Sequence, residues 1–275
     1  MQAKSGWTAP TGPLGELTES SAARASAVAR DAELVAGLEA RAAARPAPPS
    51  FAAALRGPQV RVIAELKRRS PSKGVINDGI DAPVRAAEYE RGGAAALSVL
   101  TEPTRFGGSL EDLAAVREAV QLPLLRKDFL THEVQLLEAR AAGASAVLLI
   151  ARALPPDRLR LLARVAAARG LEVLVEVRSE DELAVALSVA GAVVGVNNRN
   201  LETLAVNDAI GLRLLPLVPS DRIAIYESGV RTVDDVVRAA AAGADAVLVG
   251  SVLSASSDGA AAVGALSRVE RRARG

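Results

Sequence analysis

The chain has 275 residues, 50% of them hydrophobic, but its aromatic residues are only three Phe, two Tyr and one Trp. Lys and Arg number 33 and Asp and Glu 32, so the formal net charge of +1 excludes a general attraction to nucleic acid or anionic membranes. With no Cys and one His, disulfide frameworks, thiolate nucleophiles and metal sites that need two imidazoles are excluded. We therefore expect no metal, no nucleic-acid partner and a reducing, cytoplasmic location.

The N-terminal part predicts a helical extension and no targeting segment. Residues 1–10 are polar and interrupted by Gly6 and Pro10, so they lack the apolar centre of a signal peptide. Later apolar runs such as 146–151 are far shorter than the roughly 20 residues of a membrane helix. Residues 14–45 are rich in Ala, Glu and Arg and predict one or two helices, which a Pro-rich linker follows. We expect this extension and its linker to occupy residues 1–50.

From residue 60 onward, short Val- and Leu-rich runs alternate with Ala-rich segments of helical period. Near-continuous apolar runs are typical of parallel strands buried on both faces. Gly143, Gly191 and Gly243 each end a helical segment just before such a run. The expected strands are 60–67, 96–102, 123–129, 146–152, 172–178, 193–199, 223–229 and 246–252. Eight such units predict an α/β fold, a (β/α)8 TIM barrel over residues 51–275 that forms a single domain with the extension; a doubly wound sheet is the alternative.

Charged and amide side chains occupy the C-terminal ends of five of these apolar runs. They are Glu65 and Lys67, Lys127, Glu176, Asn197 and Arg199, and Glu227. Any one of them could be a solvated strand end or a structural ion pair. Five converging strands favour a functional site, because catalysis in a TIM barrel takes place at the C-terminal ends of the strands. Lysines and carboxylates packed together shift each other's proton affinities, so the set predicts an acid–base site that needs no His.

Small residues after the last two expected strands predict a phosphate site. Ser228-Gly229 and Gly250-Ser251 allow backbone N–H groups to approach an anion, and the loops after strands 7 and 8 often bind phosphate in TIM barrels. Either glycine alone could serve a tight turn. Together with Arg199 they predict a phosphate monoester as ligand, and Arg69 and Ser70 in the loop after the first strand could close the opposite side.

At these residues the sequence resembles the indole-3-glycerol phosphate synthase family of tryptophan biosynthesis. Two stretches are specific to that family: residues 64–74, Ala-Glu-Leu-Lys-Arg-Arg-Ser-Pro-Ser-Lys-Gly, and residues 125–129, Leu-Arg-Lys-Asp-Phe. Further matches follow in the family's order at 100–109, 175–177, 195–201, 227–229 and 250–251. Arg105 and Arg178 depart from the family pattern, which often has an aromatic residue and a His there; the departures concern the ring pocket more than the reaction.

The resemblance implies an enzyme that converts 1-(2-carboxyphenylamino)-1-deoxyribulose 5-phosphate to indole-3-glycerol phosphate, carbon dioxide and water without metal or organic cofactor. It implies that Lys127 is the general acid for ring closure and that Glu176 is an acid–base residue in the later steps. Lys67 would bind the substrate carboxylate, Asn197 would hold substrate hydroxyls, and Glu65 and Glu227 would complete the charge network. The residues implied for the phosphate and the anilino ring are Arg69, Ser70, Arg199, Ser228, Gly229, Gly250, Ser251 and Phe129.

Two other functions compete with this one. Phosphoribosylanthranilate isomerase is another phosphate-binding barrel, but its expected Cys base is impossible in a chain without Cys. A catalytically silent barrel that binds a ligand or assembles with other proteins would be favoured by loss of the Lys and Glu set, and every member is present. We expect a cytoplasmic, monomeric carboxy-lyase whose partner is a small phosphorylated substrate.

Overall fold

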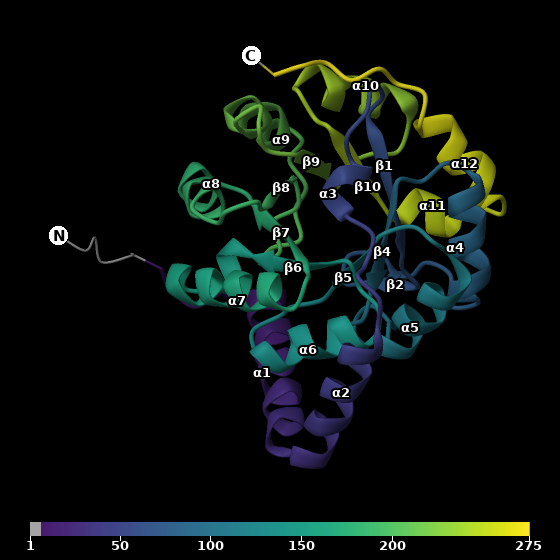
Figure 1. The fold of residues 1–275 in the computed structure, drawn as a ribbon. Helices are drawn as coiled ribbons and strands as arrows, with labels where there is room; N and C mark the ends of the chain where they lie inside the picture. The colour runs from purple at the N-terminus through teal and green to yellow at the C-terminus, as the bar shows by residue number, and fades with distance from the viewer. Residues whose placement is uncertain (1–6, 275) are drawn as a thin grey trace.

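Eight parallel strands form a closed barrel in the computed structural model, which describes residues 7–274 (Figure 1). Each strand pairs with the next one along the chain, and β1 closes the ring by pairing with both β4 and β10. The strands are β1 Arg61–Leu66, β4 Ala96–Leu100, β5 Leu124–Lys127, β6 Ala146–Ile150, β7 Glu172–Val177, β8 Val193–Asn197, β9 Ala224–Glu227 and β10 Ala246–Val249. The predicted (β/α)8 TIM barrel is confirmed, and the doubly wound alternative is wrong.

The observed strands are shorter than expected at their C-terminal ends. The expected strand 246–252 ends at Val249, and the expected strand 96–102 ends at Leu100. Lys67 and Arg199 therefore lie just outside β1 and β8, in the turns that follow. A strand ends where its ladder partners end, whereas the apolar pattern of the sequence continues into the buried first residue of the turn.

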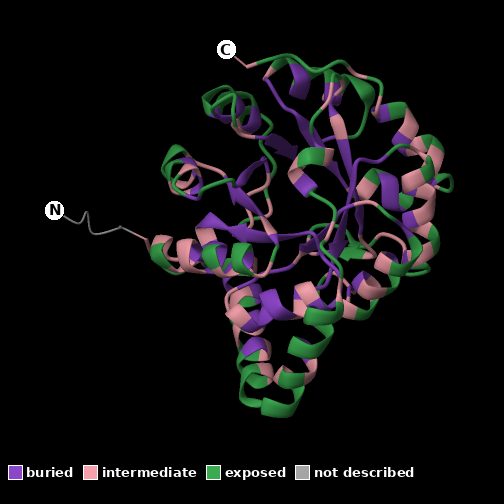
Figure 2. Cartoon of the chain, in the orientation of Figure 1, coloured by how far each residue is buried: buried purple, intermediate pink, exposed green. Residues whose placement is uncertain are grey.

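Helices surround the barrel on its outside, and their exposed surfaces face away from the strands (Figures 1 and 2). They are α4 Ala82–Arg91, α5 Leu110–Ala119, α6 Glu133–Ala141, α7 Pro156–Ala168, α8 Glu180–Leu187, α9 Ala209–Leu214, α10 Val233–Ala241, α11 Ser251–Ala255 and α12 Gly259–Leu266, with 3-10 turns at η1 Ala151–Ala153 and η2 Leu215–Leu217. Side-chain caps such as Ser109 on α5 and Ser179 on α8 accept an orphan backbone N–H at the start of the helix. Among residues 7–274, no helix is long and apolar enough to cross a membrane.

Two helices precede the barrel, α1 Gly12–Arg30 and α2 Ala32–Ala44. A small apolar cluster joins them to α6, where Ala25 and Leu38 pack with Leu137. At the start of α1, Leu14 and Leu17 are buried against the main core. The sequence predicts no targeting segment at the N-terminus, but residues 1–6 lie outside the described residues. The boundary at residue 50 between the helical extension and the barrel stays a prediction.

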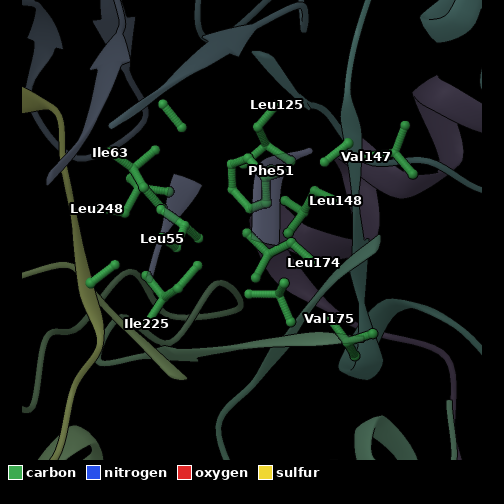
Figure 3. Close-up of a cluster of buried hydrophobic side chains, with 14 of the residues drawn as sticks. Phe51, Leu55, Ile63, Leu125, Val147, Leu148, Leu174, Val175, Ile225 and Leu248 are labelled. Carbon is green, nitrogen blue, oxygen red and sulfur yellow. The ribbon is translucent and has the colours of Figure 1, made fainter. Parts of the chain in front are cut away.

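A short helix, α3 Phe51–Ala54, fills the N-terminal end of the barrel (Figure 3). Phe51 and Leu55 are fully buried and lie among side chains from several strands, including Ile63 and Leu174. Glu172, the first residue of β7, caps this helix, since its Oε2 accepts the N–H of Ala52 at 2.6 Å. The core of the barrel is thereby closed at the end opposite to the predicted site.

Candidate active site

A cavity of about 680 Å³ opens at the C-terminal ends of the barrel strands. Thirteen of the fourteen side chains and glycines singled out in the sequence contribute to its lining. They are Glu65, Lys67, Ser70, Lys127, Phe129, Glu176, Asn197, Arg199, Glu227, Ser228, Gly229, Gly250 and Ser251. Parallel strands bring their ends to the same rim, so residues up to about 185 positions apart in the chain meet in one cavity.

The exception is Arg69, which the structure does not bring into this set. Arg69 begins β2 Arg69–Ser70, which pairs with β3 Gly74–Val75 in a short antiparallel hairpin after β1. Its guanidinium is bidentate to Asp78, with Nε 2.7 Å from Oδ1 and Nη2 2.8 Å from Oδ2. Because its side chain is about half exposed and lies outside the cavity lining, we leave Arg69 out of the phosphate site proposed below.

Lys127, the last residue of β5, lies between two buried carboxylates. Its Nζ donates a hydrogen bond to Glu227 Oε2 at 2.9 Å and lies 3.6 Å from Glu176 Oε2. Burial lowers the pKa of Lys127, but the negative charges of Glu227, Glu176 and Glu65 outweigh burial, so the pKa is raised. The side chain of Lys127 is therefore positively charged at neutral pH.

Glu65 and Lys67 form a second ion pair in the same cavity, with Nζ 2.5 Å from Oε1. Burial raises the pKa of Glu65, while Lys67, Lys127 and Arg199 lower it by more, so the carboxyl stays ionised. Gly250 leaves room for this pair, since a Cβ at that position would collide with both Glu65 Oε1 and Lys67 Nζ. A larger residue at position 250 would therefore have to displace this ion pair, which gives the glycine a packing role apart from any role toward an anion.

Glu227, at the end of β9, is 1% exposed, and its Oε1 has no hydrogen-bond partner among the described residues. Gly195 on β8 makes room for that oxygen, because a Cβ there would collide with it. Burial raises the pKa of Glu227, Lys127 lowers it, and Glu176 raises it again, with a resulting pKa of about 7 against a usual value of 4.5. This carboxyl therefore changes its charge near neutral pH.

The raised pKa of Glu227 predicts a pH dependence of stability. Folding favours the protonated carboxyl, so this stabilisation is fully present below about pH 4.5 and is lost as the pH rises through about 7. In Glu227→Gln the same position stays neutral, so the stability of the wild type relative to this variant should fall as the pH rises across that window. Urea unfolding of both proteins at several pH values measures this difference in the free energy of unfolding. If the free energies of the two proteins changed with pH in parallel, the raised pKa of Glu227 would be contradicted.

The turns after β9 and β10 provide the small residues expected near an anion. Ser228 has a φ of 63° and Gly229 a φ of 96°, so two consecutive residues adopt the left-handed conformation. A non-glycine residue in this region is uncommon and is found preferentially at functional sites. Gly250 directly precedes α11, and Arg199 lines the same cavity while its Nη1 donates to the carbonyl of Leu204 at 2.8 Å.

Comparison with known proteins decides the family. The family described as "Indole-3-glycerol phosphate synthase" matches residues 17–266 of this chain. A protein of that name from Nocardioides sp. is 53% identical over 209 residues, which cover 76% of this chain and 80% of the relative. Another from Parafrankia sp. is 50% identical over 228 residues, covering 82% of this chain and 85% of the relative. This chain belongs to the indole-3-glycerol phosphate synthase family.

Membership of the indole-3-glycerol phosphate synthase family makes the chain an enzyme of tryptophan biosynthesis, a carboxy-lyase. Solved structures of other enzymes share only the fold. The 3-hexulose-6-phosphate synthase of Salmonella typhimurium has a TM-score of 0.60 at 16% identity, covering 75% of this chain and 96% of that one. Tryptophan synthase subunit alpha from Legionella pneumophila has a TM-score of 0.57 at 15% identity, covering 75% and 91%.

Several residues that line the cavity of this indole-3-glycerol phosphate synthase family member were given no role from the sequence, although Lys73 and Phe106 lie within the stretches that resemble the family. Pro13 and Leu17 of α1 line the cavity, as does Lys73 of the hairpin loop. Phe106 also lines it and packs against Phe129, with ring centroids 6.1 Å apart. Because the chain has few aromatic residues, the presence of Phe106 could have indicated a binding role. The sequence of α1 is rich in Ala and does not indicate which of its faces covers a cavity.

Proposed function

We propose that this protein closes the indole ring of 1-(2-carboxyphenylamino)-1-deoxyribulose 5-phosphate and yields indole-3-glycerol phosphate, carbon dioxide and water. The proposal is supported above all by the ammonium group of Lys127, held between Glu227 and Glu176 inside the cavity. A carbonyl is a weak electrophile until a proton donor polarises it. A buried, charged lysine is suited to assist the attack of the anilino ring carbon on that carbonyl.

The later steps require proton transfers, which we assign to the carboxylates. Ring closure takes up one proton at the carbonyl oxygen, and the electron pair left by the departing carbon dioxide restores the aromatic ring without a proton. Loss of the resulting hydroxyl group as water takes up a second proton, and removal of a proton from the adjacent CH2 group completes the indole and gives one back. Glu176, 3.6 Å from Lys127 Nζ, is the acid–base residue for these later steps. Lys67 binds the substrate carboxylate, Glu65 holds Lys67 in place, and Asn197 binds substrate hydroxyls.

The substrate phosphate is proposed to bind at the turns after β9 and β10, on Ser228, Gly229, Gly250 and Ser251, with Arg199 beside them. Ser70 is suited to approach it from the first loop, because its Oγ is buried in the cavity wall and has no hydrogen-bond partner among the described residues. Binding energy from this remote group can orient the reacting end of the substrate.

Gly229→Asp tests this phosphate site. A carboxylate there would repel the phosphate, and the positive φ and the nearby Asp208 carboxylate add strain and further negative charge. We expect KM to rise by about tenfold or more and inhibition by inorganic phosphate to weaken in parallel. Gly93→Asp, at another positive-φ glycine with open space around it and outside the cavity lining, is the matched control. Equal phosphate inhibition in Gly229→Asp and the wild type would show that the phosphate binds elsewhere.

The reaction itself is tested by mixing purified protein with the carboxyphenylamino-deoxyribulose phosphate and following indole fluorescence. The chain contains one Trp, so the protein background is low. In this assay we expect product to form without added metal or cofactor. We further propose that the active protein is a monomer and that it is cytoplasmic. Folded protein that forms no product from intact substrate would favour the silent barrel.

A further inference from the structure

We propose that Arg24, on helix α1, positions the aromatic wall of the substrate pocket by compensating two buried carboxylates, Glu102 and Asp128. The aromatic wall consists of Phe106 and Phe129, which both line the cavity. Arg24 is outside the cavity lining and acts only through the residues that it holds. The inference rests on the proposed function, because it assigns the anilino ring of the substrate to this wall.

Asp128 holds the first half of the wall. Its side chain is 2% exposed, and its Oδ1 accepts the backbone N–H of Phe129 at 2.8 Å. Its Oδ2 accepts the hydroxyl of Thr101 at 2.7 Å, which ties the end of β5 to the end of β4. Asp128 directly follows Lys127, so the same carboxylate fixes the backbone between the proposed general acid and the ring of Phe129.

Glu102 holds the second half. Its side chain is fully buried, and its Oε2 accepts the backbone N–H groups of Arg105 at 2.7 Å and Phe106 at 3.1 Å. Its Oε1 accepts the N–H and the hydroxyl of Thr104 at 3.0 and 2.6 Å. One carboxylate thus organises the whole turn that presents Phe106 to the cavity.

Arg24 is the cation that the two carboxylates share. Its Nη1 lies 3.9 Å from Glu102 Oε1 and its Nη2 lies 3.7 Å from Asp128 Oδ1. Asp128 has a second cation, Arg126 at 3.3 Å, which also pairs with Glu138 at 3.0 Å. For Glu102, by contrast, Arg24 is the one cation within 4.0 Å in the part of the chain that the structure describes.

Removal of Arg24 would leave the charge of Glu102 buried without a cation. A buried carboxylate in this state is strongly unfavourable, and the local structure relaxes to bring water to it. The turn from Thr104 to Phe106 depends on Glu102 and would shift with it, and the contact between the two phenylalanine rings would loosen. Arg24 contacts neither Lys127 nor the proposed phosphate site at the turns after β9 and β10. Its removal should therefore weaken binding of the anilino ring of the substrate.

Kinetics of Arg24→Met, Arg24→Lys and the control Glu16→Gln test this inference. Glu16 lies on the same helix and pairs with Arg105 of the same turn at 3.1 Å, but both side chains are more than half exposed. In Arg24→Met we expect KM to rise about tenfold, with kcat changed less than about threefold and phosphate inhibition unchanged. Arg24→Lys should recover most of the loss, because an ammonium restores the charge, and Glu16→Gln should behave as the wild type.

Two results for Arg24→Met would contradict the inference. A KM within about twofold of wild type in Arg24→Met would overturn it, as would an equal weakening of phosphate inhibition, which indicates general loosening of the barrel. If Arg24→Met does not fold, the comparison of Arg24→Gln with Arg24→Lys replaces it. An unchanged KM in both variants would overturn the proposal. A KM that is raised in Arg24→Gln but close to wild type in Arg24→Lys would support it. A wild type that forms no product overturns the proposed function and this inference together, whereas an active wild type with unaffected Arg24 variants overturns the inference alone.

Discussion

Replacing Lys127 by methionine is expected to lower kcat by about 10²- to 10⁴-fold, the usual cost of losing a general acid. The variant keeps the length of the side chain but removes the proton donor that lies 2.9 Å from Glu227 and 3.6 Å from Glu176. Turnover at saturating substrate, followed by indole fluorescence, measures the loss. Inhibition by inorganic phosphate should stay close to the wild-type level, because Lys127 is not part of the proposed phosphate site.

Lys127→Arg is the matched control for this prediction. It keeps a positive charge beside both carboxylates, but a guanidinium gives up its proton far less readily than an ammonium. We therefore expect a folded protein that is nearly as slow as Lys127→Met. Near-normal turnover in Lys127→Met would remove Lys127 from the mechanism, and near-normal turnover in Lys127→Arg alone would change its role from proton donor to electrostatic stabiliser.

Phe51→Ala is expected to lower the free energy of unfolding by about 3–5 kcal/mol, because it empties a fully buried site at the N-terminal end of the barrel. The neighbouring strands cannot collapse into the space, since each is held on both sides by its ladder partners. The active-site cavity is at the opposite end, so kcat at a temperature where the variant is folded should change little. Urea unfolding and turnover of the same sample measure both effects.

Phe51→Leu is the control, with a smaller expected cost of less than about 1.5 kcal/mol because it nearly conserves apolar volume. Ala53→Gly, in the same short helix, tests whether a loss of helix propensity alone can account for the result. A stability change in Phe51→Ala no larger than that in Ala53→Gly would show that α3 contributes little to the core.

Much of the fold could be predicted because the signal repeats. Each strand is an apolar run, and a glycine-ended helical segment precedes several of them, as at Gly143 and Gly243. The strands in the structure differ from the expected ones mainly in having shorter ends. The convergence of Glu65, Lys127 and Glu227 also followed from the sequence, since parallel strands of a closed barrel place their C-terminal ends on one rim.

Other parts could not be predicted, because they depend on contacts between segments that share no pattern. Arg69 stands in a motif with Ser70, yet a two-residue strand turns it toward Asp78 and away from the cavity. Phe51 begins a four-residue helix whose sequence does not distinguish a barrel plug from a surface turn. On an Ala-rich helix, Arg24 resembles any solvated arginine, and only the folded chain reveals the carboxylates of Glu102 and Asp128 beneath it.

The closed end of the barrel limits how small molecules can enter and leave the cavity. Because Phe51 and Leu55 fill the axis at the N-terminal end, nothing held in the cavity can leave through the middle of the barrel. Substrate, carbon dioxide and the indole product of the proposed reaction must therefore share the rim that α1 borders through Pro13 and Leu17. Product that has not yet left occupies the cavity that the next substrate needs, so for the proposed reaction we expect the product to inhibit competitively with the substrate.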